Sequence, residues 1–129
     1  MKIFLKYQRL TILWALFVLF MCLMPMGNIG ESSMFFPGFD KLVHCGFFFV
    51  FMVFAETGLI RQRKNFVFGR ILITAVAAVI FGGAIELLQQ YIFTWRDGDW
   101  RDLFADTVGI GMATFSIIIT YTALRYGKS

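Results

Sequence analysis

The sequence predicts an all-α membrane protein, a bundle of four transmembrane helices with its N- and C-termini in the cytoplasm. Of its 129 residues, 59% are hydrophobic and only 16% are charged, whereas soluble domains average about 25% charged residues. The apolar residues gather in four runs, each about as long as the roughly 20 residues that cross a bilayer. A soluble protein of this size could not bury so many apolar side chains, but lipid can solvate them.

The first apolar run, residues 10–26, follows a basic segment that contains Lys2, Lys6 and Arg9. A basic start before an apolar run is also typical of a signal peptide, but no cleavage site with small residues follows this run. We therefore predict an uncleaved helix that ends near Pro25, since proline cannot continue a helix.

The second predicted helix, residues 40–60, begins after a segment rich in turn-forming residues, 27–39. Asp40 at its start can cap free backbone N–H groups and suits the positive end of a helix. A short basic segment, 61–65, separates this helix from the third predicted helix, residues 69–93.

The fourth predicted helix, residues 102–124, follows a polar segment that contains Trp95 and Trp100. Tryptophan is enriched where membrane helices reach the water interface. We see no internal repeat and no low-complexity linker, so we treat residues 1–129 as a single transmembrane domain.

The basic residues predict the orientation, because cytoplasmic segments carry an excess of Lys and Arg. With the N-terminus inside, nine of the 12 Lys and Arg residues fall on the inner side. The formal net charge of +4 is then mostly a topology signal, and we expect no nucleic-acid partner. The three outer basic residues are Lys41, Arg96 and Arg101.

Small and polar residues share helix faces in the third and fourth helices. Side chains three or four positions apart lie on one face, which groups Gly82 with Glu86 and Asp106 with Gly109. Small residues let helices approach closely and polar ones hydrogen-bond across the contact. We therefore expect these two faces to pack together. Glu56 lies apart, near the inner end of the second helix, and we interpret it as a structural partner of Arg61 or Arg63.

The polar residues of three helices fall in one outer layer of this topology. A carboxylate inside an apolar run needs a partner or water, and Glu86 lies about 12 Å inside the outer end of its helix at 1.5 Å per residue. We predict an outward-facing polar cluster, either open to water or held by buried ion pairs. Its candidate ligand-binding residues are Asp40, His44, Glu86, Gln89, Arg96, Asp99, Asp102 and Asp106.

Four short motifs run through this cluster. They are D-K-x-x-H at 40–44, E-x-x-Q at 86–89, Arg96 in the following segment, and D-hydrophobic-x-A-x-x-x-G at 102–109. In this order and spacing they resemble the VanZ-like family of small bacterial integral membrane proteins. That family usually has Asn at the position of Asp106, where the extra negative charge calls for another cation or a shared proton.

The resemblance implies a multi-pass protein of the bacterial cytoplasmic (plasma) membrane. The founding member of the family is linked to low-level resistance to the glycopeptide teicoplanin, which implies a role in the cell envelope. The family has no settled biochemical activity to transfer. Besides the lipid bilayer, the expected partner is a lipid-linked cell-wall precursor or another anionic lipid, and the oligomeric state stays open.

Three interpretations of the cluster remain open. We prefer a binding site that faces the cell wall, where Lys41, Arg96 and Arg101 contact an anionic head group, because Arg donates two parallel hydrogen bonds to phosphate or carboxylate. The first alternative is a membrane enzyme that acts on a lipid-linked phosphate or ester, with His44 and Glu86 as acid and base. The second is a purely structural network that joins the helices, with the function residing in protein partners.

We predict no cofactor and no metal ion. The carboxylates around His44 would suit Mg²⁺, Ca²⁺ or Mn²⁺ better than structural zinc, but a single histidine among carboxylates is more often paired than ligating. Cys22 and Cys45 lie in apolar runs, and we interpret them as packing residues rather than a disulfide.

Overall fold

The structure is a computed structural model that describes residues 1–24, 38–64, 68–94 and 98–126. These residues form four α-helices, and no strand occurs among them. Each helix is long and apolar enough to cross a membrane. The helices are α1 (Lys2–Leu23), α2 (Phe39–Arg63), α3 (Phe68–Tyr91) and α4 (Trp100–Tyr126).

The predicted number and order of the helices are confirmed, and the largest difference in their bounds is the start of α1. The helix begins at Lys2 instead of residue 10. Its hydrogen bonds continue through the basic segment, because Lys and Arg are good helix formers. The apolar run therefore marks the part of the helix that suits lipid and not the whole helix. The predicted end at Pro25 and Met26 lies outside the described residues.

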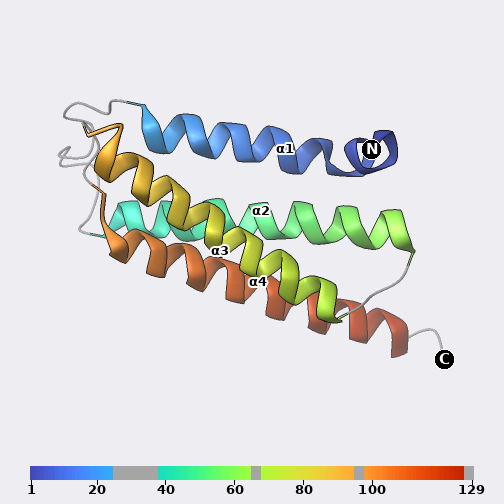
Figure 1. Ribbon diagram of the computed structural model, residues 1–129. Helices are drawn as coiled ribbons and strands as arrows, with labels where there is room; N and C mark the ends of the chain where they lie inside the picture. Colours follow the sequence, from blue (N-terminus) through green and yellow to red (C-terminus); the bar gives the residue numbers. More distant parts are fainter. Residues whose placement is uncertain (25–37, 65–67, 95–97, 127–129) are drawn as a thin grey trace.

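The helices run side by side, and α3 crosses α2 and α4 obliquely (Figure 1). The start of α1, the end of α2, the start of α3 and the end of α4 lie at one end of the bundle. The start of α2, the end of α3 and the start of α4 lie at the other end, where the sequence places its polar cluster. The up-and-down order therefore brings the beginnings of α2 and α4 together.

The most extensive helix contact joins α2 to α4. Gly109 makes this possible, because a Cβ atom at this position would lie 2.1 Å from the backbone oxygen of Cys45. Gly82 on α3 faces α4, since a Cβ there would lie 2.9 Å from Asp106 Oδ2. The small residues thus mark close contacts as expected, but Gly109 packs against α2 and not against α3.

Helix α1 is held by three side chains that donate to backbone oxygens. Gln8 Nε2 donates to the carbonyl of Ala55 at 3.1 Å, and Trp14 Nε1 donates to that of Phe47 at 2.8 Å. At the other end of the helix, Gln89 Nε2 donates to the carbonyl of Cys22 at 2.7 Å. Hydrogen bonds of this kind hold helices together where lipid removes the hydrophobic drive to associate.

The core is a cluster of mostly aliphatic side chains along the centre of the bundle, and Cys22 is part of it as predicted. Large apolar side chains also remain on the outside, among them Ile73 at 70% and Phe115 at 65% exposure. Exposed large apolar side chains occur on all four helices, which fits a multi-pass membrane protein. The buried core residues are Val18, Cys22, Phe48, Met52, Ala78, Ile85, Ile110 and Ala113.

The expected pairing of Glu56 with Arg61 or Arg63 is not found in the structure. The Glu56 side chain is 1% exposed and forms no ion pair with Arg61 or Arg63, which are both exposed. Arg61 instead lies 5.8 Å from the centre of the Tyr7 ring on α1. The carboxylate points into the bundle because its helix face is the one that packs against neighbouring helices.

Candidate functional site

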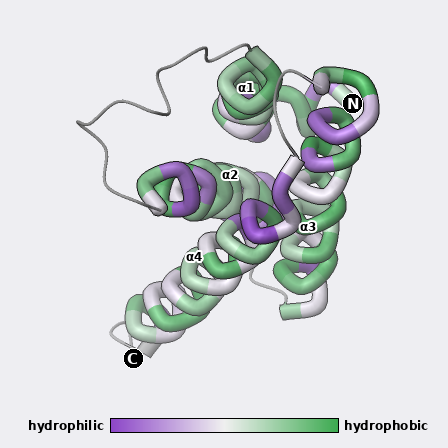
Figure 2. Tube along the Cα trace, turned by 90° about the vertical axis from the view of Figure 1, so that its left-hand side faces the viewer, coloured by the Kyte–Doolittle hydropathy of each residue, from purple (hydrophilic) through white to green (hydrophobic). Residues whose placement is uncertain are grey.

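Polar residues meet at the end of the bundle where α2 and α4 begin. Figure 2 looks at the molecule from this end and shows hydrophilic first turns on α2 and α4, whereas most of each helix is hydrophobic. Asp102 lies in the first turn of α4 and Asp40 in that of α2, where a carboxylate suits the positive helix end. The close α2–α4 contact brings these two polar starts together.

Lys41 is the hub of the outer part of this cluster. Its Nζ donates to Asp40 Oδ2 and to Asp99 Oδ2, both at 2.9 Å, and also to Asp102 Oδ1. An ammonium group has three N–H donors, so the three carboxylates use all of them. In the structure the ammonium group of Lys41 is therefore occupied by these three carboxylates.

A second, buried layer lies below Lys41. His44 is 4% exposed, and its Nδ1 lies 3.0 Å from Asp106 Oδ1. Its Nε2 lies 3.5 Å from Asp102 Oδ2, so the ring is placed between two carboxylates of α4. The Asp106 carboxylate, which departs from the VanZ-like pattern, is thus a direct partner of the histidine.

Glu86 joins this layer from α3. Its side chain is 1% exposed, and Oε2 accepts a hydrogen bond from the backbone N–H of Asp99 at 2.8 Å. This bond ties the segment before α4 to the end of α3. Among the described residues, Glu86 Oε1 and Asp106 Oδ2 are buried without a hydrogen-bond partner.

Asp99 precedes α4 and binds both basic groups of the outer part. The hydrogen bond from the Lys41 ammonium, with a further one from the backbone N–H of Arg101, lowers the pKa of Asp99 to about 2. Ionised Asp99 is therefore favoured by the folded protein. The side chain of Arg101 adds a bond from its Nε to Asp99 Oδ1 at 3.3 Å.

This electrostatic contact predicts an acid-sensitive part of the stability. Because the pKa of Asp99 falls from 3.8 to about 2 on folding, its contribution is complete above the unfolded value and is lost as the pH falls toward about 2. We expect Asp99→Asn to lower the unfolding midpoint at pH 7 and to approach wild type near pH 2. Thermal unfolding in detergent across this range measures the difference. A gap that stays constant down to pH 2 would contradict an electrostatic origin, since Asn keeps the Oδ1 acceptor.

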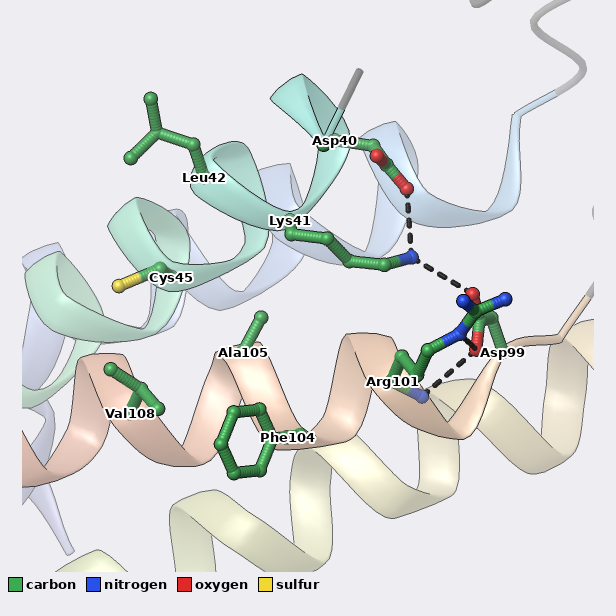
Figure 3. A pocket seen from close by; sticks show the side chains of 10 residues that line it. Asp40, Lys41, Leu42, Cys45, Asp99, Arg101, Phe104, Ala105 and Val108 are labelled. Carbon is green, nitrogen blue, oxygen red and sulfur yellow. Dashed lines mark hydrogen bonds and ion pairs between the residues drawn. The ribbon is translucent and has the colours of Figure 1, made fainter.

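An open groove lies between the first turns of α2 and α4, beside the Lys41 hub, with a volume of about 690 Å³ (Figure 3). Its polar end is lined by Asp40, Lys41, Asp99 and Arg101. The remainder is apolar, and Phe104 on this side is 72% exposed. The apolar lining residues are Leu42, Cys45, Phe104, Ala105 and Val108, and Gly38 completes the lining.

The structure brings most of the predicted cluster together but divides it by burial. The groove reaches Asp40 and Asp99, whereas none of the buried carboxylates lines it. Gln89 is 2% exposed and its amide donates to α1 instead of to the cluster. Arg96 lies outside the described residues. The buried layer consists of His44, Glu86, Asp102 and Asp106.

Sequence reasoning missed the central position of Lys41 and the backbone contact of Asp99 with Glu86. A signal for the first was present, because Lys41 directly follows Asp40 and lies in the same predicted layer as Asp99 and Asp102. No comparable signal exists for the second, which depends on the path of the backbone before α4. Comparison of the chain with protein-family models, curated proteins and solved structures finds no match.

Proposed function

We propose that this chain is a VanZ-like, multi-pass protein of the bacterial plasma membrane that binds a lipid-linked phosphate of the cell envelope in the groove between α2 and α4. The observation that carries this proposal is the two-part lining of the groove. Its polar end contains an exposed arginine, and its other side is a strip of apolar residues that runs along the helices. A lipid has the same division into a charged head group and an apolar chain.

Arg101 is the group that we assign to the head group. Its side chain is 85% exposed, and its ion pair with Asp99 is formed by Nε. The guanidinium carries five N–H donors in a fixed fork, so the Nη groups can bind a phosphate bidentately while Nε keeps its partner. In Figure 3 the guanidinium of Arg101 lies at the polar end of the groove, next to Asp99.

The apolar lining is assigned to the lipid chain. Leu42 is 59% exposed, Phe104 72% and Val108 41%, so these side chains are available for contact from the lipid side. Phe104 and Val108 are four residues apart on α4, so they lie on the same face of the helix. A polyisoprenyl chain laid against this face would keep its phosphate at Arg101.

The distribution of basic residues supports an orientation with both termini in the cytoplasm, as proposed from the sequence. The end of the bundle with the start of α1 and the end of α4 includes Lys2, Lys6 and Arg125 (Figure 1). In that orientation the groove opens at the outer leaflet, where lipid-linked cell-wall precursors are used. A protein that affects glycopeptide action would also need to act there.

Enzymatic acid–base catalysis is less well supported, because neither His44 nor Glu86 lines the groove. The buried layer to which they belong instead links α2, α3 and α4, which supports the structural alternative for that part of the cluster. We therefore assign binding to the groove and keep the two parts separate.

The head-group assignment is tested with Arg101→Gln. Purified protein in detergent is titrated with undecaprenyl phosphate, and bound lipid is counted by native mass spectrometry. We expect about tenfold weaker binding, since a hydrogen bond to a charged group contributes about 1.5–3 kcal/mol. The matched control is Arg125→Gln, at the opposite end of the same helix, which should bind as wild type does.

The apolar assignment is tested in the same titration with Phe104→Ala. Its control is Phe115→Ala, an equally large exposed side chain about three turns further along the same face of α4. We expect only Phe104→Ala to weaken binding. The proposed function is wrong if inorganic phosphate or phosphatidylglycerol binds as well as undecaprenyl phosphate, or if all four variants behave alike.

A further inference from the structure

Behind the groove, three buried side chains from three helices converge. His44 of α2, Glu86 of α3 and Asp106 of α4 are 4%, 1% and 1% exposed. Each offers a ligand atom, one ring nitrogen or carboxylate oxygen, and these atoms all lie within 4.8 Å of one another. None of the three lines the groove, so this cluster is separate from the lipid site proposed above.

Two oxygens of this cluster have no hydrogen-bond partner in the part of the chain that the structure describes. They are Glu86 Oε1 and Asp106 Oδ2, both fully buried. Buried polar atoms are nearly always paired, and an unpaired one costs free energy because it loses its water. The two unpaired oxygens therefore indicate a missing partner, which is either a cation or a hydrogen-bond donor.

The formal charges of the buried layer point to a cation. Glu86, Asp102 and Asp106 are three carboxylates, and among the described residues the basic groups in contact with this layer are His44 and Lys41. Lys41 is also shared with Asp40 and Asp99. Carboxylates buried without compensating charge are strongly destabilising, so a divalent cation would balance the layer better than a neutral ligand.

We propose that His44, Glu86 and Asp106 form a binding site for a divalent first-row transition metal ion of the Mn²⁺ class. A spread of up to 4.8 Å between ligand atoms is about twice a metal–ligand distance of roughly 2.0–2.4 Å. Carboxylate oxygens suit Mn²⁺, Mg²⁺ and Ca²⁺, whereas an imidazole nitrogen favours a transition metal over the last two. The sequence alone favours pairing over ligation for His44, and the two orphaned oxygens change that balance.

The test is a titration of the full-length protein, purified in detergent without a histidine tag, with Mn²⁺ followed by electron paramagnetic resonance. We expect one saturable site per chain. Glu86→Gln and Asp106→Asn keep the size of each side chain and should weaken binding at least tenfold, since even changes to groups that hydrogen-bond to metal ligands cost about 10–100-fold. The matched control is Glu56→Gln, which alters another carboxylate that is 1% exposed and has an unpartnered oxygen. It should bind Mn²⁺ as wild type does.

A second measurement on the wild type keeps the proposal testable if the variants do not fold. The chain contains a single histidine, so nitrogen coupling to bound Mn²⁺ in pulsed spectra would assign the ligand to His44. The proposal is overturned if wild type shows no saturable site, if the bound ion shows no nitrogen coupling, or if Glu56→Gln loses binding to the same extent. Displacement of Mn²⁺ by an equal concentration of Ca²⁺ would overturn the assignment to a transition metal.

Discussion

Gly109→Ala is expected to lower the free energy of unfolding by about 3 kcal/mol, in the upper part of the range for overpacked contacts. The added methyl group would meet the backbone oxygen of Cys45 at 2.1 Å. A flexible side chain could turn away, but a helix backbone cannot, so α2 and α4 must separate. Because this contact aligns the starts of both helices, the substitution should also disturb the polar cluster.

The control for this experiment lies two residues away. A Cβ atom at Gly111 would meet nothing within 4 Å, and alanine restricts the unfolded chain more than glycine does. Gly111→Ala should therefore be neutral or slightly stabilising. Denaturant or thermal unfolding in detergent measures both variants, and similar losses in the two would show that helix propensity, and not the contact with Cys45, determines the effect.

Lys41→Met is expected to lower the free energy of unfolding by about 2–3 kcal/mol. Removing one member of a buried ion pair costs about 3–5 kcal/mol, and this side chain is 30% exposed, which reduces the loss through screening. Methionine keeps the length of the apolar stem, so the change removes mainly the ammonium group. Asp40, Asp99 and Asp102 would then face one another without their shared cation.

A double-mutant cycle separates this effect from packing. If the loss comes from uncompensated carboxylates, Asp102→Asn should restore part of the stability in the Lys41→Met background but destabilise the wild type. Lys2→Met, an exposed lysine at the start of α1, should change little. Additive effects of Lys41→Met and Asp102→Asn would contradict the assignment of Lys41 as the hub of the carboxylates.

The helices could be predicted from the sequence because length and apolar composition determine them locally. Four apolar runs of sufficient length predict α1 to α4. The structure starts α2 at Phe39 and α4 at Trp100, close to the predicted starts at residues 40 and 102. The start of α1 differs more, because the helix begins at Lys2 and includes the basic segment before the apolar run. Hydrogen bonding along a helix does not require apolar side chains, so Lys6 and Arg9 continue it.

The candidate site could be predicted only as a layer. Alternating helix directions place His44, Glu86 and Asp106 at one depth, and the structure confirms that they meet. The predicted packing of the faces with Gly82 and Asp106 is found in the structure, but the contact of Gly109 with Cys45 of α2 was not predicted. Gln89 was predicted to belong to the cluster, but its amide donates to Cys22 of α1. The structure also separates the exposed groove from the buried layer. The spacing of residues in the sequence does not predict this separation.

The pairing of α2 with α4 has a consequence for the order of events on the ribosome. Lys41 and Asp102 are separated by 61 residues, with all of α3 between them. At about 5–20 residues per second, translation leaves Lys41 and His44 without their α4 partners for roughly 3–12 s. During that interval Lys41 has Asp40 of its own helix as a counter-charge, but His44 lacks both of its carboxylate partners, Asp102 and Asp106. The end of the bundle at which α2 and α4 begin can therefore close only after α4 has been made, so it is the last part of the bundle to assemble.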